Sequence, residues 1–267
     1  MKLPSILSLL ILLTGATKAI AQDLTDADQI VAKANLVAFY QGADGRAETR
    51  MKIVDSKGRE QIRQFTILRK DIEDGGNQIF YVLFSRPSDV KNTAFLVKKQ
   101  PTGDDDRWLY LPSLDLVKRI SSGDKRTSFV GSHFFYEDIS GRNLTADRHA
   151  LTQTTPTHYV VKNTPANPAD VEFSHYMVWI QKDTFIPEKA EYFDSQNKLY
   201  RRISAENIKS IDGFPTATKM KVEDLRDGSY SVSEMRFIRY NIDLPDSVFS
   251  ERSLRNPPYN WLSEQKR

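Results

Sequence analysis

The sequence of 267 residues contains no cysteine. This absence excludes structural disulfides, thiolate zinc sites and anchoring through a lipid-modified cysteine. The one long apolar run, Ile6 to Leu13, is shorter than the roughly 20 apolar residues that span a bilayer. An excess of either charge is also lacking, because 38 Lys and Arg stand against 35 Asp and Glu. This balance gives no sign of a nucleic-acid-binding surface, which needs basic residues gathered on one face.

The first 21 residues have the pattern of an export signal. Lys2 gives a positive start, the apolar run follows, and Ala19-Ile20-Ala21 matches the small-x-small pattern that signal peptidase cleaves. We therefore expect residues 1–21 to be a cleaved signal peptide and the mature protein to be periplasmic, soluble and not lipid-anchored. The alternative, an uncleaved anchor, is disfavoured by the length of the run. Loss of Lys2 and Lys18 leaves 36 basic against 35 acidic residues, a formal charge of +1.

The mature chain is predicted to be mainly β (α+β), with one clear helix. Residues 23–42 carry apolar side chains at helical spacing, with Thr25 as the expected N-cap and Gly42 as the end. The period then changes to two, and about eleven short strands with hairpin-length connections predict one antiparallel sheet that curls or closes. No linker divides it, so we expect a single domain over residues 22–267. Strands are expected at residues 46–54, 61–70, 79–84, 93–99, 107–111, 116–120, 158–162, 173–182, 186–193, 198–208, 216–225 and 230–240.

No catalytic or metal-binding constellation is evident in the sequence. Gly131-Ser132-His133 lacks the second glycine of a nucleophile elbow, and Asp104-Asp105-Asp106 lacks the spacing of a calcium loop. The carboxylate pair Glu137-Asp138 leaves a glycosidase-like hydrolase as one open hypothesis. We expect no enzyme activity, no metal and no cofactor. The four histidines form no His-Glu-x-x-His pair: His133, His149, His158 and His175.

Three segments occur in a recognisable order. The first runs from Phe84 to Leu96, the second from Asp106 through Trp108-Leu109-Tyr110-Leu111-Pro112 to Ile120, and the third from Ser128 to Asp138. Their order and spacing resemble the outer-membrane lipoprotein-sorting family of bacteria, in the branch with a LolA-like fold, over about residues 30–262. One departure is His133, where the family pattern has an acidic residue, so no charge-based role carries over to this position.

The resemblance implies a strongly curved, incomplete antiparallel β-barrel with lid or plug helices on its concave face. It further implies a non-enzymatic periplasmic carrier of lipids or lipoprotein acyl chains in outer-membrane biogenesis. Such a carrier works beside a membrane transporter of the resistance-nodulation-division (RND) type. The alternative is an accessory subunit that docks on this transporter without carrying lipid. We expect a monomer with no nucleic-acid partner.

An acyl-chain carrier has to keep its ligand out of water, at about 0.8 kcal/mol per buried CH₂. One face of a curved sheet can line the cavity that does so. Residues 121–150, which interrupt the strand series, are the candidate lid or plug. Nearby, Arg119, Lys125 and Arg126 are candidate donors to a phosphate head group. The side chains expected to line the cavity are aromatic or aliphatic: Phe80, Val82, Phe84, Phe95, Trp108, Tyr110, Phe129, Phe134, Met177 and Trp179.

Overall fold

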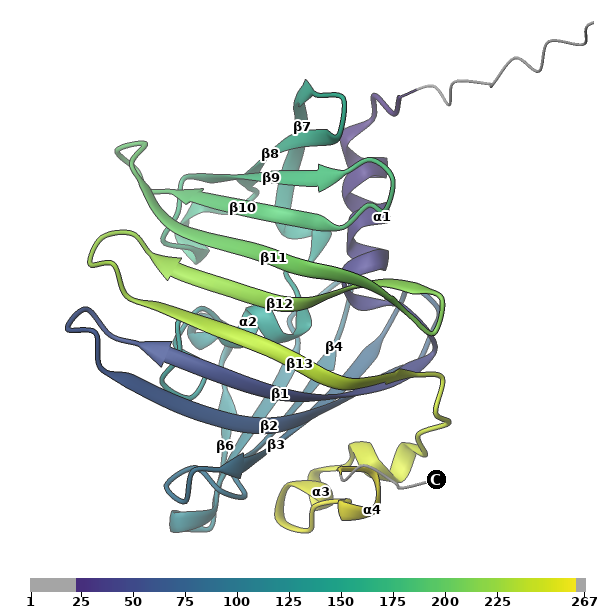
Figure 1. Cartoon of the computed structure of the whole chain (residues 1–267), viewed down its shortest axis with the longest axis vertical. Helices are drawn as coiled ribbons and strands as arrows, with labels where there is room; N and C mark the ends of the chain where they lie inside the picture. The colour runs from purple at the N-terminus through teal and green to yellow at the C-terminus, as the bar shows by residue number, and fades with distance from the viewer. Residues whose placement is uncertain (1–22, 263–267) are drawn as a thin grey trace, which may run out of the picture.

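A single antiparallel sheet of thirteen strands, curved but not closed, runs through residues 23–262, the part of the chain that the computed structural model describes (Figure 1). The strands are β1 (Asp44–Val54), β2 (Glu60–Asp71), β3 (Gln78–Arg86), β4 (Ala94–Lys99), β5 (Asp106–Leu111), β6 (Leu116–Ile120), β7 (Asp147–Thr154), β8 (His158–Pro165), β9 (His175–Gln181), β10 (Pro187–Phe193), β11 (Leu199–Ile211), β12 (Phe214–Asp224) and β13 (Tyr230–Tyr240). The α-helices are α1 (Ala27–Phe39), α2 (Tyr136–Ser140), α3 (Glu251–Arg255) and α4 (Tyr259–Leu262). Short 3₁₀ turns are η1 (Pro112–Leu114), η2 (Ser122–Asp124), η3 (Leu144–Ala146), η4 (Pro168–Asp170) and η5 (Asp246–Phe249).

The strand order is β6-β5-β4-β3-β2-β1-β13-β12-β11-β10-β9-β8-β7, so consecutive strands are neighbours except where β1 pairs with β13. That pairing joins an N-terminal and a C-terminal half into one sheet. The mainly β fold and the incomplete barrel expected from the sequence are confirmed. The predicted signal peptide lies outside the described residues.

Two details differ from the sequence prediction. The sheet has thirteen strands where about eleven were expected, and β7 is the strand that none of the twelve expected ranges covers. It is an edge strand with mostly exposed, polar side chains, so it lacks the apolar alternation that reveals a half-buried strand. Helix α1 is confirmed, but its N-cap is Asp26 rather than Thr25, because the Asp26 carboxylate accepts hydrogen bonds from the amides of Asp28 and Gln29.

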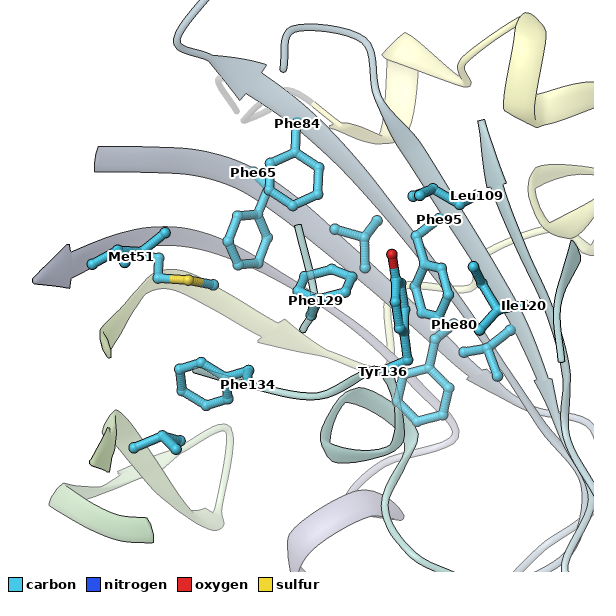
Figure 2. Close-up of a cluster of buried hydrophobic side chains, with 14 residues drawn as sticks. Met51, Phe65, Phe80, Phe84, Phe95, Leu109, Ile120, Phe129, Phe134 and Tyr136 are labelled. Carbon is cyan, nitrogen blue, oxygen red and sulfur yellow. The ribbon is translucent and has the colours of Figure 1, made fainter. Parts of the chain in front are cut away.

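Strand β3 is apolar on both faces because both faces are covered. Phe80, Val82 and Phe84 point to the inner face, where they join a cluster that includes side chains from residues 129–136 (Figure 2). Tyr81 and Leu83 point to the outer face. A strand that packs against a hydrophobic core on each face therefore has a continuous apolar sequence instead of an alternating one.

The C-terminal tail covers the outer face of β2 to β5. Its buried side chains pack with those of the strands, and the Tyr81 hydroxyl donates a hydrogen bond of 2.8 Å to the Ser253 carbonyl. Leu254, on α3, has no solvent-exposed surface. The tail is therefore an integral part of the core.

We expect Leu254→Ala to lower the free energy of unfolding by about 3 kcal/mol, because it removes a fully buried side chain and leaves a cavity. Urea denaturation followed by circular dichroism measures this loss. The matched control is Leu114→Ala in η1, since Leu114 is 68% exposed and its truncation should change stability by less than about 0.5 kcal/mol. Equal stability of the two variants would contradict the role of the tail.

Two helices lie on the inner side of the sheet. Helix α1 packs on β7 and β8, where Ile30 and Ala34 contact a cluster containing Tyr159 and Val161. Its C-terminal end is held by side chains of the sheet, because Arg69 and the Gln78 amide both donate hydrogen bonds to the Phe39 carbonyl. These donors complement the carbonyl groups that a helix leaves unpaired at its end.

Candidate functional site

An apolar cavity of about 350 Å³ lies on the inner face, between the two inner helices and strands β1, β2 and β11 to β13. Its wall includes Phe39 at the end of α1, Ile139 of α2 and Ala205 of β11. Three of the five methionines of the chain also line it: Met51, Met220 and Met235. Methionine side chains are flexible and polarizable, so they adapt to apolar ligands of varying shape. The cavity has the size and lining typical of a small apolar ligand site.

Two of the ten residues expected to line a cavity, Phe80 and Phe134, are on this wall. Four others lie in the adjacent buried cluster, where they pack against one another (Figure 2). The ring of Phe129 is 5.7 Å from that of Phe84 and 5.4 Å from that of Phe95, measured between centroids. Together with Val82, these side chains fill the part of the inner face below β3 and β4.

The remaining four expected residues lie elsewhere. Trp108 and Tyr110 are on the outer face of β5, where they pack against the cluster that contains the C-terminal tail. Met177 and Trp179 alternate along β9 with Val178 and Ile180, which pack in the cluster under α1. They therefore point to the opposite, outer face, and the ammonium of Lys189 lies 3.5 Å from the centre of the Trp179 ring.

The segment 121–150, the candidate lid or plug, contributes to the inner face of the sheet. Its side chains Phe129, Phe134 and Tyr136 are buried in the main cluster, and the Tyr136 ring lies 5.4 Å from that of Phe95. The same segment contributes Asp138 and Ile139 to the cavity wall. Helix α2 is thus both part of the core and one side of the cavity.

Ion pairs of three largely buried arginines hold this segment together and attach it to the sheet. Arg126 donates to Glu137 at 2.7 Å and to Glu172 at 2.7 Å. Arg142 donates to Glu137 at 3.0 Å and to Asp147 at 2.8 Å. A fifth pair joins Asp138 of α2 to Arg201 of β11 at 2.5 Å. We call these seven residues the α2 ion network: Arg126, Glu137, Asp138, Arg142, Asp147, Glu172 and Arg201.

The three cations expected to meet a phosphate head group all have partners within the chain. Arg119 pairs with Asp106, and Arg126 is part of the α2 ion network. The Lys125 ammonium lies 3.6 Å from a carboxylate oxygen of Asp104. Of the three, Lys125 thus has the longest ion pair.

The network sets the ionisation of its two glutamates. Burial alone would raise the pKa of Glu137, but the guanidinium groups of Arg126 and Arg142 lower it below its usual value. Burial also opposes ionisation of Glu172, yet hydrogen bonds and charge from Arg126 lower its pKa to about 2. A glycosidase-type general acid needs the opposite, a raised pKa. The carboxylate pair Glu137-Asp138 therefore serves the α2 ion network.

We expect the protein to lose stability as the pH falls from about 4.5 toward 2. Both glutamates have a lower pKa in the folded than in the unfolded protein, so the stability that they contribute is present above the unfolded pKa and is lost as they are protonated. Urea denaturation at pH 7, 4 and 3 measures this dependence. Glu172→Gln should flatten it, and an unchanged dependence in that variant would contradict the assignment.

Each of the four histidines makes a hydrogen bond within the fold through its ring. The two ring nitrogens of His133 each lie 2.8 Å from a serine hydroxyl, those of Ser231 and Ser229, and burial lowers the pKa of its imidazole.

Across residues 23–262, no three His, Cys, Asp or Glu side chains come together as a metal site would require. Among the helices described there, none has both the length and the apolar character to cross a membrane.

Comparison with known proteins identifies the family. A family model described as an uncharacterized protein matches residues 76–256, more than half of the chain. A sequence search of curated proteins finds no match. The structure is similar to a DUF1329 family protein from Desulfovibrio piger, with 29% identity, a TM-score of 0.78 and coverage of 85% of this chain and 97% of that one.

Two further solved structures are similar over nearly their whole length. A putative outer membrane lipoprotein-sorting protein domain from Vibrio parahaemolyticus has 25% identity and a TM-score of 0.77, covering 86% of this chain and 98% of that one. A LolA superfamily protein from Nitrosomonas europaea has 23% identity and a TM-score of 0.66, covering 86% and 99%, and so supports the fold. The chain belongs to a LolA-like family.

Proposed function

We propose that the mature protein, one domain over residues 22–267, is a periplasmic carrier that binds an acyl chain of a lipid or lipoprotein. The observation that supports this proposal best is the apolar cavity of about 350 Å³ on the inner face of the sheet. The similarity to a putative lipoprotein-sorting domain points in the same direction. Of the ten residues expected from the sequence, Phe80 and Phe134 are the ones that we assign to ligand contact.

The volume of the cavity sets the size of the ligand. An apolar protein cavity of about 150 Å³ holds one benzene molecule, which is about 25 Å³ per carbon. At that packing, a cavity of about 350 Å³ holds about 14 carbons, or one acyl chain of medium length. A cargo with several chains requires more room, which movement of the segment 121–150 off the inner face supplies.

We propose that the carrier exchanges its cargo between envelope membranes with a transporter of the RND type. Native mass spectrometry of residues 22–267, purified from a bacterial periplasm without detergent, tests the first step. The expected result is a co-purified phospholipid or other acyl species. A ligand-free mass, together with no binding of a fluorescent fatty-acid probe, would overturn the carrier function. Capture of a transporter by this lipid-free protein would then identify it as the accessory subunit.

A further inference from the structure

A second pocket, of about 270 Å³, is polar and adjoins the same short helix α2. Its wall is built from the loop between β4 and β5, from Lys125, and from residues 141–146 after the helix. Helix α2 contributes to both spaces, because Asp138 and Ile139 line the apolar cavity while Glu137 and the following Gly141 line the polar pocket. An apolar and a polar space thus share one helix as a common wall.

Residues that line the two spaces are in direct contact. Phe39 lines the apolar cavity and Gly141 lines the polar pocket. A Cβ atom placed on Gly141 would lie only 2.6 Å from ring carbons of Phe39, so the ring rests directly on the Gly141 backbone. Gly141 has a φ of +79°, which glycine adopts without strain. The buried Lys99 ammonium lies here as well, 5.4 Å from the centre of the Phe39 ring, and donates a hydrogen bond to the Gly141 carbonyl. A ligand that reaches both spaces therefore has to displace the Phe39 ring and pass Lys99.

Two buried atoms of the polar pocket have no hydrogen-bond partner among residues 23–262. Arg107 is 2% exposed, and its guanidinium binds Asp105 at 2.6 Å, but its Nε has no acceptor. The Asn143 amide nitrogen donates to the Gly103 carbonyl, which fixes the orientation of the amide and leaves its Oδ1 without a donor. Unsatisfied buried polar groups are costly. Each of these two atoms exposes less than 1 Å² of surface, so a ligand or water reaches it only when neighbouring side chains move.

Two charged groups complete the set that a ligand can use. The Lys125 ammonium lies 3.6 Å from a carboxylate oxygen of Asp104, and a hydrogen bond from Ser122 together with Lys125 lowers the pKa of that carboxyl. The carboxylate of Asp170, at the end of η4, makes no hydrogen bond or ion pair within the described part of the chain. The pocket lining therefore combines an ammonium with one carboxylate partner, an exposed carboxylate, and two buried atoms that lack partners.

The charged and polar groups that line this pocket favour a zwitterionic ligand. An anion alone would meet the Asp104 and Asp170 carboxylates, and a cation alone would leave the Arg107 donor unsatisfied. A group with an anionic oxygen and an ammonium satisfies both kinds of partner through charge-assisted hydrogen bonds. At about 25 Å³ per non-hydrogen atom, the pocket holds about eleven such atoms, which is enough room for the roughly eight of a phosphoethanolamine head group.

We infer that the polar pocket binds the zwitterionic head group, of the phosphoethanolamine type, of the lipid whose acyl chain occupies the apolar cavity. This inference rests on the proposed carrier function. The phosphate oxygens contact Arg107 and Lys125, and the ammonium contacts Asn143 and Asp170. The ligand passes where the Phe39 ring now separates the two spaces, so binding of the complete lipid turns that ring aside.

The test compares lysophospholipids that share one lauroyl chain and differ in head group. The unmodified protein should bind the phosphoethanolamine lipid at least tenfold more tightly than the phosphoglycerol lipid, as measured by displacement of a fluorescent fatty-acid probe. Lys125→Gln and Asp170→Asn should each reduce this ratio to twofold or less. The control, Lys118→Gln on the edge strand β6, removes an exposed lysine outside the pocket and should keep the full ratio.

The outcomes separate this inference from the carrier function. If neither lipid and no fatty acid binds, the carrier function fails and the head-group assignment fails with it. If both lipids bind within twofold of each other, the carrier function stands and the head-group assignment is overturned, with water as the partner of the free atoms. A preference that both variants retain overturns the placement in this pocket. Binding of soluble phosphoethanolamine as tightly as the lipid would support the pocket chemistry and overturn the lipid as its source.

Discussion

The Ala205→Phe variant is expected to bind an acyl chain of about 14 carbons roughly a thousandfold more weakly than the unmodified protein. Ala205 is 5% exposed, lies opposite Met220 in the sheet and forms part of the cavity wall. The added ring occupies about 150 Å³, as benzene does, and leaves room for about eight carbons. About six methylene groups then stay in water at about 0.8 kcal/mol each, close to 5 kcal/mol in total. That free energy corresponds to more than three powers of ten in affinity.

The measurement is a chain-length series of fatty acids, from about 8 to about 18 carbons, on both proteins. The matched control is Ser204→Phe, which adds the same ring one residue earlier on β11 and on the opposite face of the sheet. The chain-length optimum should shorten in Ala205→Phe and stay in place in Ser204→Phe. The same optimum in both variants would show that the chain binds outside this cavity.

The position of this cavity is a feature that the sequence did not predict. The ten expected residues were chosen because their side chains are aromatic or aliphatic. Large apolar side chains pack against one another, so most of these ten fill a core or point to the outer face. A cavity lies where side chains are too small to fill the space, as at Ala205 and Ser233 on its wall. Methionine is the residue type that marks its wall in the sequence, because Met220 and Met235 occupy inner positions of β12 and β13.

The alternation of side chains along a strand was predictable from the sequence, but the sequence did not show which of the two faces is the inner one. In β5 the alternation of Trp108 and Tyr110 with Leu109 and Leu111 is clear, and the structure places the two pairs on opposite faces. The pattern does not say which face is the inner one, because the C-terminal tail makes the outer face apolar as well. That information comes from contacts between residues far apart in the chain, such as Tyr81 and Ser253.

The α2 ion network was beyond prediction for the same reason. Glu137 was visible as a carboxylate beside aromatic residues, which left a hydrolase as one hypothesis. Its role follows from Arg126, eleven residues away, and from the link of Arg126 to Glu172 across 46 residues. Charged residues in a loop are usually solvated, so burial of these pairs is visible only in the folded chain.

Glu137→Gln is expected to lower the free energy of unfolding at pH 7 by about 3–5 kcal/mol. The substitution keeps the size of the side chain and removes its charge, so two buried guanidinium groups, of Arg126 and Arg142, lose a shared anionic partner. Removing one partner of a buried ion pair costs this much because the remaining charge stays buried and less compensated. The control Glu60→Gln breaks the exposed pair with Lys52 and should cost less than about 1 kcal/mol.

The same variant connects stability to the proposed carrier function. Helix α2 forms one wall of the cavity, and the ion network is what attaches it to β7 and β11. A weaker attachment lets the segment 121–150 leave the inner face more often, so a fatty-acid probe should bind to Glu137→Gln with a faster association rate than to the unmodified protein or to Glu60→Gln. Stopped-flow fluorescence measures these rates. A loss of stability without any change in rate would show that the segment is a fixed plug, and that the cavity fills by another path.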